Sequence, residues 1–306
     1  MTHRFRTLLR AGLVGLWAAA WSSGACAALD VFACEPEWGA LAKELGGERI
    51  GLYVATTARQ DPHRIEARPS LIAQARRAQL VVCTGAELET GWLPLLQTQS
   101  ANPAIQAGRP GYFEAAAHVE LIERPGQVDR SMGDVHAAGN PHVHLDPRNI
   151  ARIAAALGER MAQIDSENAE HYRMRTRQFL ERWRQASAKW ETVGAALKGI
   201  PVVVHHRDTS YLLHWLGMRE VGALESKPGI PPTASHLGEL LGRLAQQPAK
   251  LVMRSAYSDP RPAQWISQRT MLAVVVLPFT VGGNDKAQDL FGLFDDTLER
   301  LLTAAK

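Results

Sequence analysis

Apolar runs of strand length alternate with segments of helical spacing along nearly the whole chain. In the first half the strand-like runs are LDVFAC, IGLYVAT, QLVVCTG and AHVELIE, at residues 29–34, 50–56, 79–85 and 117–123. In the second half they are VVVHH, REVGAL, KLVMRSA and LAVVVLP, at residues 202–206, 219–224, 250–256 and 272–278. Strands of this kind, separated by helices, form parallel sheets that are covered on both faces. The pattern predicts an α/β fold of two doubly wound lobes with parallel sheets.

One helical pattern near the middle of the chain is longer than an ordinary crossover helix. Asp146 and Pro147 have the features of an N-cap and a first helical residue, and they begin a helix that closes the first lobe. Beyond it, apolar residues such as Tyr172 and Trp190 recur every three or four positions. We expect a long, rigid helix that lies along both lobes and permits only small lobe motions. The predicted divisions are a signal peptide (1–27), an N-terminal lobe (28–164), a connecting helix (165–198) and a C-terminal lobe (199–306).

The first 27 residues have the composition of an export signal. Arginines without any acidic residue precede the apolar segment AGLVGLWAAAWSSG, and AlaCysAla at 25–27 matches the small residues of a cleavage site. Cys26 would also allow a lipoprotein, but Ser23 stands where a lipobox normally has a large aliphatic residue. We therefore favour a soluble periplasmic protein and keep lipid anchoring at Cys26 as the alternative.

Removal of this segment changes the charge balance. Lys+Arg falls from 34 to 31 when Arg4, Arg6 and Arg10 are lost, and Asp+Glu is also 31, so the mature chain is nearly neutral. A nucleic-acid-binding protein is not expected, because such proteins are basic. No other apolar run approaches the roughly 20 residues of a membrane span. With 46% hydrophobic and 21% charged residues, the remainder is expected to be soluble and globular.

Two cysteines remain after residue 27 in what should be an oxidising compartment. Cys34 and Cys83 each end a strand-like run, and these two strands are neighbours if they are the first and third of a doubly wound sheet. The order predicts a disulfide between them, with two buried free thiols as the alternative.

Three histidines follow strand-like runs, where open α/β sheets place their ligands. They are His63 in QDPHRIEARPS, His142 in GNPHVHLDP and His206 in VVVHHRDTS. Their wide separation excludes a local zinc finger, so the whole fold must bring them together. Imidazole is the commonest metal ligand in proteins and suits Zn(II). The sequence therefore predicts one metal site between the two lobes.

Other residues compete for places in this site. His205 should point away because strand neighbours alternate, whereas His144 could share the side of His142. His136 is another nearby histidine. A carboxylate would complete a tetrahedron, and we predict Asp285 in the loop after the last strand, with Asp289 as the alternative that also serves as an N-cap. The remaining histidines lie in helix or strand patterns and are read as structural: His118, His171, His214 and His236.

Four segments carry a family resemblance: DPHRIEARPS, LVVCTGAELETGWL, NPHVHLDP and HHRDTSYLLHWLG. With them, essentially the whole mature chain resembles the cluster A-I family, the metal-capturing proteins of bacterial ATP-driven zinc and manganese importers. The resemblance implies two α/β lobes joined by one long helix, no catalysis, and capture of a metal ion for delivery to a membrane permease. The family's ligand histidines correspond to His63, His142 and His206. We expect a monomer that carries Zn(II), with Mn(II) as a possibility.

The chain departs from the family pattern at several places. Asn140 replaces the aspartate often found before the proline of the second motif, and His144 replaces a tryptophan. When the chain is aligned with the family pattern without gaps, Val281 stands at the position of the family's carboxylate ligand. The long histidine-rich loop of many zinc members is missing, and the same interval holds only His118 and His136. Three histidines nevertheless favour zinc, since Mn(II) sites usually contain more carboxylate oxygen.

The rival hypothesis is a zinc hydrolase in which the same three histidines leave a position open for an activated water. Such an enzyme needs a general base, and Glu66, Glu87 or Glu89 could be nominated, but none stands in a motif like HExxH. A siderophore or haem receptor would show a wide basic or aromatic cleft, which the loops do not suggest. We therefore favour a binding protein over an enzyme.

Overall fold

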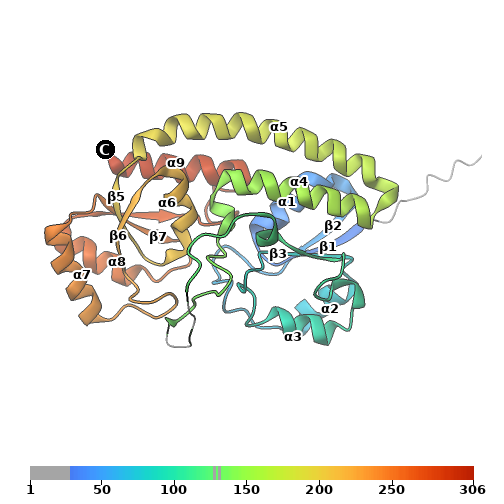
Figure 1. Cartoon of the computed structure of the whole chain (residues 1–306), viewed down its shortest axis with the longest axis horizontal. Coiled ribbons are helices and arrows are strands. Elements are labelled where there is room, and N and C mark those ends of the chain that lie inside the picture. Colours follow the sequence, from blue (N-terminus) through green and yellow to red (C-terminus); the bar gives the residue numbers. More distant parts are fainter. Residues whose placement is uncertain (1–27, 127–128, 130–131) are drawn as a thin grey trace, which may run out of the picture.

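The computed structural model describes residues 28–126, 129 and 132–306, arranged as two lobes side by side under a layer of long helices (Figure 1). The predicted signal peptide and Cys26 lie outside these residues. The strands are β1 Leu29–Ala33, β2 Ile50–Val54, β3 Leu80–Cys83, β4 Tyr112–Glu114, β5 Pro201–Val204, β6 Arg219–Ala223, β7 Leu251–Ser255 and β8 Ala273–Leu277. The helices are α1 Pro36–Gly46, α2 Pro69–Arg77, α3 Leu93–Ser100, α4 Pro147–Ile164, α5 Ala169–Gly194, α6 Ser210–Leu216, α7 Ala234–Gln246, α8 Pro260–Thr270 and α9 Leu290–Ala305.

The two lobes contain sheets of the same strand order. The first sheet runs β2-β1-β3-β4 and the second runs β6-β5-β7-β8, with parallel pairing throughout. This confirms the predicted fold class of two parallel-sheet α/β lobes. In sheets of this order, the chain reverses its direction of winding beside the first strand, and the carboxyl ends of the strands form a crevice there.

One predicted strand was wrong. Residues 117–123 do not form a strand: residues 115–118 form a 3-10 turn, and the fourth strand is instead β4, Tyr112–Glu114. The apolar residues of the predicted strand serve a different purpose, since Leu121 and Ile122 pack against the main core as a loop. Apolar periodicity reports burial, and it does not distinguish a buried loop from a buried strand.

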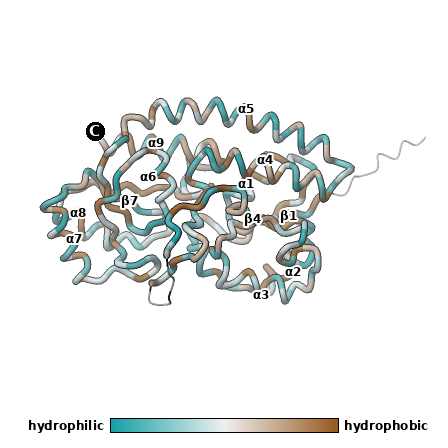
Figure 2. The backbone as a smooth tube through the Cα atoms, in the orientation of Figure 1, coloured by the Kyte–Doolittle hydropathy of each residue, from teal (hydrophilic) through white to brown (hydrophobic). Residues whose placement is uncertain are grey.

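Helix α5 is the long helix that the sequence predicted. It spans 26 residues, is extended by 3-10 turns at Ser166–Asn168 and Ala195–Leu197, and runs along both lobes (Figure 1). Its outer face is hydrophilic and its inner face carries hydrophobic positions (Figure 2). Buried aromatic residues of that face, including Trp183 and Trp190, pack against Phe294 of α9. One continuous hydrophobic cluster therefore includes both lobes and α5.

The predicted helix starts are supported by side-chain caps. The Asp146 carboxylate accepts a hydrogen bond from the Arg148 amide and Pro147 is the first residue of α4. Asp289 accepts a hydrogen bond from the Gly292 amide at the start of α9, so it has the capping role expected of it.

The disulfide between Cys34 and Cys83 is also confirmed. Strands β1 and β3 are neighbours in the sheet, and the two cysteines at their ends lie with Cα atoms 4.8 Å apart. Both residues are completely buried. In the part of the chain that the structure describes, no helix is long and apolar enough to cross a membrane.

Candidate metal centre

Three histidines from three distant segments meet between the lobes. His63 lies in the connection from β2 to α2, His142 lies just before α4, and His206 follows β5. Within the described residues, one ring nitrogen from each lies within 4.8 Å of the other two. The ring centroids of the three pairs are 5.4, 6.0 and 5.8 Å apart. The structure thus brings together the three histidines that the sequence selected.

Each of these imidazoles is oriented by an oxygen at its Nδ1 atom. His63 Nδ1 lies 2.7 Å from Asp61 Oδ1, and His206 Nδ1 lies 2.7 Å from Glu225 Oε2. Because a carboxylate only accepts hydrogen bonds, both Nδ1 atoms carry a proton, and in the neutral ring the lone pair is on Nε2. This is the tautomer that binds a metal through Nε2.

His142 has the same arrangement with a neutral partner. Its Nδ1 lies 2.9 Å from Asn140 Oδ1, while the amide nitrogen of Asn140 donates to Glu123 and to the carbonyl of Arg207. That network fixes the amide so that its oxygen faces His142. His142 Nε2 is buried and has no hydrogen-bond partner. A buried imidazole nitrogen without a partner is costly, and a bound cation would satisfy it.

Burial and neighbouring groups shift the pKa values of two of these histidines in opposite directions. Burial, reinforced by the nearby His63 and His206, lowers the pKa of His142 well below its ordinary value. Burial would also lower the pKa of His206, but the hydrogen bond to Glu225 and the charges of Asp208 and Glu225 outweigh it and raise that pKa. A metal ion therefore meets a neutral ligand at His142 and must compete with a proton at His206.

The rival histidines have other surroundings. His144 is buried and both its ring nitrogens are engaged: Nδ1 lies 3.3 Å from Glu37 Oε1 and Nε2 lies 3.0 Å from the carbonyl of Phe279. It therefore links α1 to the second lobe and offers no free nitrogen. His205 lies beside His206 but is not part of the group of close ligand atoms, and its Nδ1 is buried without a partner. His136 lies against His63, with the two Nε2 atoms 3.2 Å apart.

The structure does not bring the predicted fourth ligand to the three histidines. Asp285 is exposed in the loop between β8 and α9 and does not belong to the group of close ligand atoms. Asp289 is exposed and caps α9. The loop that holds Asp285 is tied together by Asn284, which accepts hydrogen bonds from the amides of Lys286 and Ala287.

The sequence reasoning missed the three oxygen partners of the histidines. Asp61 and Asn140 each lie two residues before a ligand histidine, in the matched triplets AspProHis and AsnProHis, so the repeated spacing was a usable signal. Glu225 lies in the connection after β6, nineteen positions from His206, and nothing in the sequence joins the two. Its Oε2 also accepts from the amide of Gly229, which fixes its position.

The bases nominated for a hydrolase are engaged or remote. Glu66 is exposed, Glu87 accepts a hydrogen bond from the amide of Ala137, and Glu89 is buried against the amides of Thr84 and Gly85. None of the three carboxylates joins the histidine group.

Glu89 does lie near Cys34 and Cys83, but these sulfurs form a disulfide and are not thiolate ligands.

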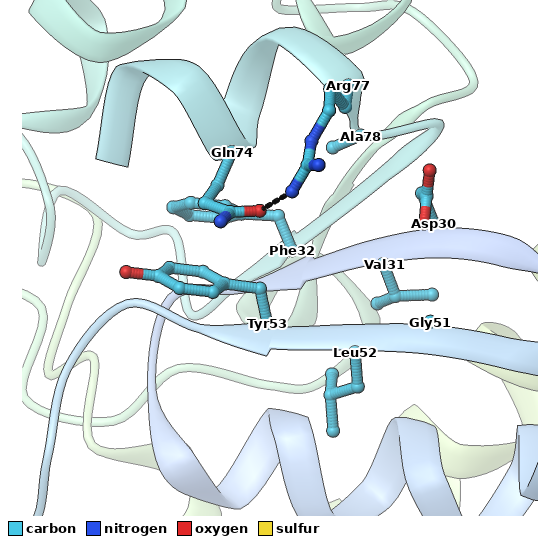
Figure 3. Close-up of a pocket in the computed structure, with 9 residues that line it drawn as sticks. All are labelled: Asp30, Val31, Phe32, Gly51, Leu52, Tyr53, Gln74, Arg77 and Ala78. Atoms are coloured by element: carbon cyan, nitrogen blue, oxygen red, sulfur yellow. Dashed lines mark hydrogen bonds between the residues drawn. The ribbon is translucent and has the colours of Figure 1, made fainter. Parts of the chain in front are cut away.

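Two hollows adjoin the histidines, and a third lies elsewhere. One of about 280 Å³ contains His136, His142 and His206, and one of about 350 Å³ contains Asp61, His206 and Glu225. The third, about 320 Å³, lies at the β1–β2 side of the first lobe, where Tyr53 faces the Gln74 and Arg77 pair of α2 (Figure 3). Its lining includes one carboxylate, Asp30, and no histidine or cysteine, so it lacks the chemistry of a metal site.

The chain matches one protein-family model and several curated relatives. The family described as "Zinc-uptake complex component A periplasmic" (ZnuA) matches residues 31–304. The manganese ABC transporter substrate-binding lipoprotein scaA of Streptococcus gordonii is 25% identical over 302 residues, covering 94% of this chain and 92% of its own length. The manganese ABC transporter substrate-binding lipoprotein PsaA of Streptococcus anginosus is 24% identical, covering 78% of this chain and 76% of its own.

Solved structures share the fold. A crystal structure of ZnuA has a TM-score of 0.74 at 18% identity and covers 91% of this chain and 100% of its own. The cadmium-bound periplasmic metal-binding protein of Candidatus Liberibacter asiaticus has a TM-score of 0.72 at 15% identity and covers 90% of this chain and 99% of its own. At these identities the likeness establishes the two-lobed architecture alone.

Proposed function

Because the chain belongs to the ZnuA family of periplasmic zinc-uptake components, we propose that it captures Zn(II) between its two lobes and delivers the ion to the membrane permease of an ABC importer. Members of this family are solute-binding proteins of metal ABC transporters and are not enzymes.

The observation that carries the proposal is the meeting of three imidazole rings between the lobes. The Nδ1 atoms of His63, His142 and His206 face oxygen partners, one nitrogen of each ring lies within 4.8 Å of the other two, and His142 Nε2 is buried without a partner. We infer that these three nitrogens hold the ion. Asp285, the carboxylate expected from the sequence, would have to move from an exposed loop to join them, so we do not include it in the proposed ligand set.

Zinc is proposed over manganese on the chemistry of these ligands. The named relatives are manganese proteins, which leaves the metal of this chain open. Imidazole suits Zn(II), whereas Mn(II) prefers carboxylate and other oxygen ligands. The carboxylates of Asp61 and Glu225 face Nδ1 atoms and act by orienting the rings.

We propose that the mature protein acts as a periplasmic monomer after removal of residues 1–27, with lipid attachment at Cys26 as the alternative that the named lipoprotein relatives raise. Its proposed division is an N-terminal lobe at 28–164, a connecting helix at 165–198 and a C-terminal lobe at 199–306. Membrane fractionation of cells that express the full chain and a Cys26→Ala variant distinguishes the two locations.

The test is metal binding by residues 28–306 after removal of bound ions with a chelator. Titration calorimetry with Zn(II) and Mn(II) should show one zinc ion per chain, bound more tightly than manganese. Each of His63→Ala, His142→Ala and His206→Ala should weaken zinc binding by at least about 100-fold, since even residues that only orient metal ligands contribute about 10- to 100-fold.

A matched control is His214→Ala on the exposed side of α6, which should bind zinc as the wild type does. Unchanged zinc affinity in all three ligand variants would refute the proposed site. Tighter binding of manganese than of zinc by the wild type would refute the proposed metal.

A further inference from the structure

His136 lies beside the three histidines in a contact that needs an explanation. Its Nε2 atom is 3.2 Å from His63 Nε2, and the two rings are stacked with centroids 5.2 Å apart. His136 also lines the same hollow as His142 and His206. It belongs to the long connection between β4 and α4, which also supplies His142.

The position of His136 is fixed by contacts on both sides of it. The amide of Asp134 donates to the carbonyl of Pro228 in the second lobe, at 2.8 Å. The amide of Ala137 donates to Glu87 of the first lobe, at 2.6 Å. At Gly133, where φ is +79°, a Cβ atom would lie 2.1 Å from the same Pro228 carbonyl, so only glycine permits this close approach.

The distance between the two Nε2 atoms matches one edge of a metal site. His63 Nδ1–H donates a hydrogen bond to Asp61, so the neutral ring presents its Nε2 lone pair toward His136. Without an ion, His136 Nε2–H can donate to that lone pair. In a tetrahedral zinc site with Zn–N bonds of about 2.0–2.1 Å, neighbouring nitrogens lie roughly 3.3–3.4 Å apart. The observed 3.2 Å is close to that spacing.

We propose that His136 is the fourth protein ligand of the transported ion, and that it makes the site an all-nitrogen one selective for zinc. This inference rests on the proposed function. When the ion takes the lone pair of His63, the proton of His136 moves from Nε2 to Nδ1 by exchange with water at this partly exposed ring, which frees Nε2 for the ion without net proton release. His136 lies outside the group of three close nitrogens, so the bound ion draws its ring inward.

The chemical consequence is selectivity. A fourth imidazole favours Zn(II), whereas a carboxylate at this position would favour Mn(II), because Mn(II) prefers oxygen ligands. In the metal-bound protein, His136 thus takes the coordination position for which the sequence predicted a carboxylate from the second lobe. It comes instead from the first lobe, in the segment 133–137 that contacts both lobes.

The first experiment counts ligands without any substitution. X-ray absorption of the zinc-loaded wild type, as residues 28–306, should fit four imidazole nitrogens and no carboxylate oxygen. His136→Ala should reduce the fitted imidazoles from four to three, with a water oxygen in the vacated position, while circular dichroism confirms that the variant folds. A wild-type shell of three imidazoles would overturn the proposal.

The second experiment measures selectivity. His136→Ala should weaken zinc binding by at least about tenfold and manganese binding by less. His136→Asp should lower the ratio of zinc affinity to manganese affinity further. The matched control is His118→Ala, which removes the other histidine of the same interval, stacked on Phe113 away from the site. It should change neither affinity.

The outcomes separate this proposal from the one on which it rests. If His63→Ala, His142→Ala and His206→Ala lose zinc but His136→Ala binds it as the wild type does, His136 is not a ligand and the proposed function stands. If the wild type binds neither zinc nor manganese, both proposals fail.

Discussion

The two lobes have the same strand order but contribute to the metal centre from different strands. In the first lobe the histidines come from the connections after β2 and β4, whereas in the second lobe His206 follows the central strand β5. The connection from β4 to α4 spans residues 115–146, and its counterpart from β8 to α9 spans only 278–289. The strand order places the ends of the strands at the crevice, while the length of each loop decides which side chains reach the centre of the crevice.

The ends of the central strands also differ in charge. In the first lobe, Glu35 and Glu89 are buried together beside Thr84. At the corresponding place in the second lobe, Asp208 accepts hydrogen bonds from the hydroxyls of Ser255 and Tyr257. The second lobe therefore satisfies a buried carboxylate with neutral donors, while the first lobe holds two carboxylates close to each other.

The largest expected effect comes from giving His206, the ligand of the second lobe, a neutral partner of the kind that His142 has in the first lobe. Glu225→Gln replaces a charged acceptor of His206 Nδ1 by a neutral amide, the kind of partner that Asn140 provides for His142. Loss of the carboxylate makes His206 less basic and orients it less firmly, so zinc affinity should fall about 10- to 100-fold. Titration calorimetry of wild type and variant at one pH measures the change.

Glu239→Gln is the matched control, because Glu239 is an exposed carboxylate on α7 away from the site. Equal zinc affinity in Glu225→Gln and Glu239→Gln would show that the charge at Glu225 does not support His206.

A smaller effect should follow from the removal of one buried hydrogen bond that joins the two lobes. The Thr280 hydroxyl of the second lobe donates to Glu37 of α1, and both residues are buried. Thr280→Val preserves the shape and removes the donor to a charged group, so the free energy of unfolding should fall by about 1–3 kcal/mol. Urea denaturation should still show one transition, because the main hydrophobic cluster is shared by both lobes.

Thr270→Val is its control, since that hydroxyl donates to Ile266 within one helix and joins no lobes. Two separate unfolding transitions in the wild type would contradict the shared core.

The smallest expected effect concerns the buried carboxylates of the first lobe. Burial, together with the nearby Glu89 and Glu37, raises the pKa of Glu35 well above its ordinary value, and burial raises the pKa of Glu89 to about 7. The folded protein thus keeps protons that the unfolded chain releases above its ordinary carboxyl pKa. Their stabilisation is full below about pH 4.3 and is lost as the pH rises toward and through 7.

Glu35→Gln removes one of the two charges and supplies an amide donor. The variant should gain about 1 kcal/mol or more of stability at pH 8 relative to wild type, and its stability should depend less on pH between 5 and 8. Chemical denaturation across that range measures both, with the exposed Glu48→Gln as control. An unchanged pH dependence would contradict the raised pKa values of these two carboxyl groups.

Much of the fold could be predicted because its signals are local. Strand-like runs, the cap at Asp146 and the long amphipathic pattern of α5 report burial and backbone preference over a few neighbouring residues. The strand expected at 117–123 failed for the same reason, since a buried loop presents the same apolar pattern. The disulfide followed from the strand order once β1 and β3 were taken as neighbours.

Hydrophobic period and strand order were enough to predict two parallel-sheet lobes and the long helix α5. The same reasoning selected His63, His142 and His206, although His142 follows a long connection and not a strand. The partners of the histidines depend on how distant loops pack in the folded protein. Glu225 reaches His206 and His136 reaches His63 across loops whose paths no local pattern encodes. The tertiary structure also left Asp285 exposed, because a contact between distant loops depends on how two lobes pack, and that packing is a property of the whole core.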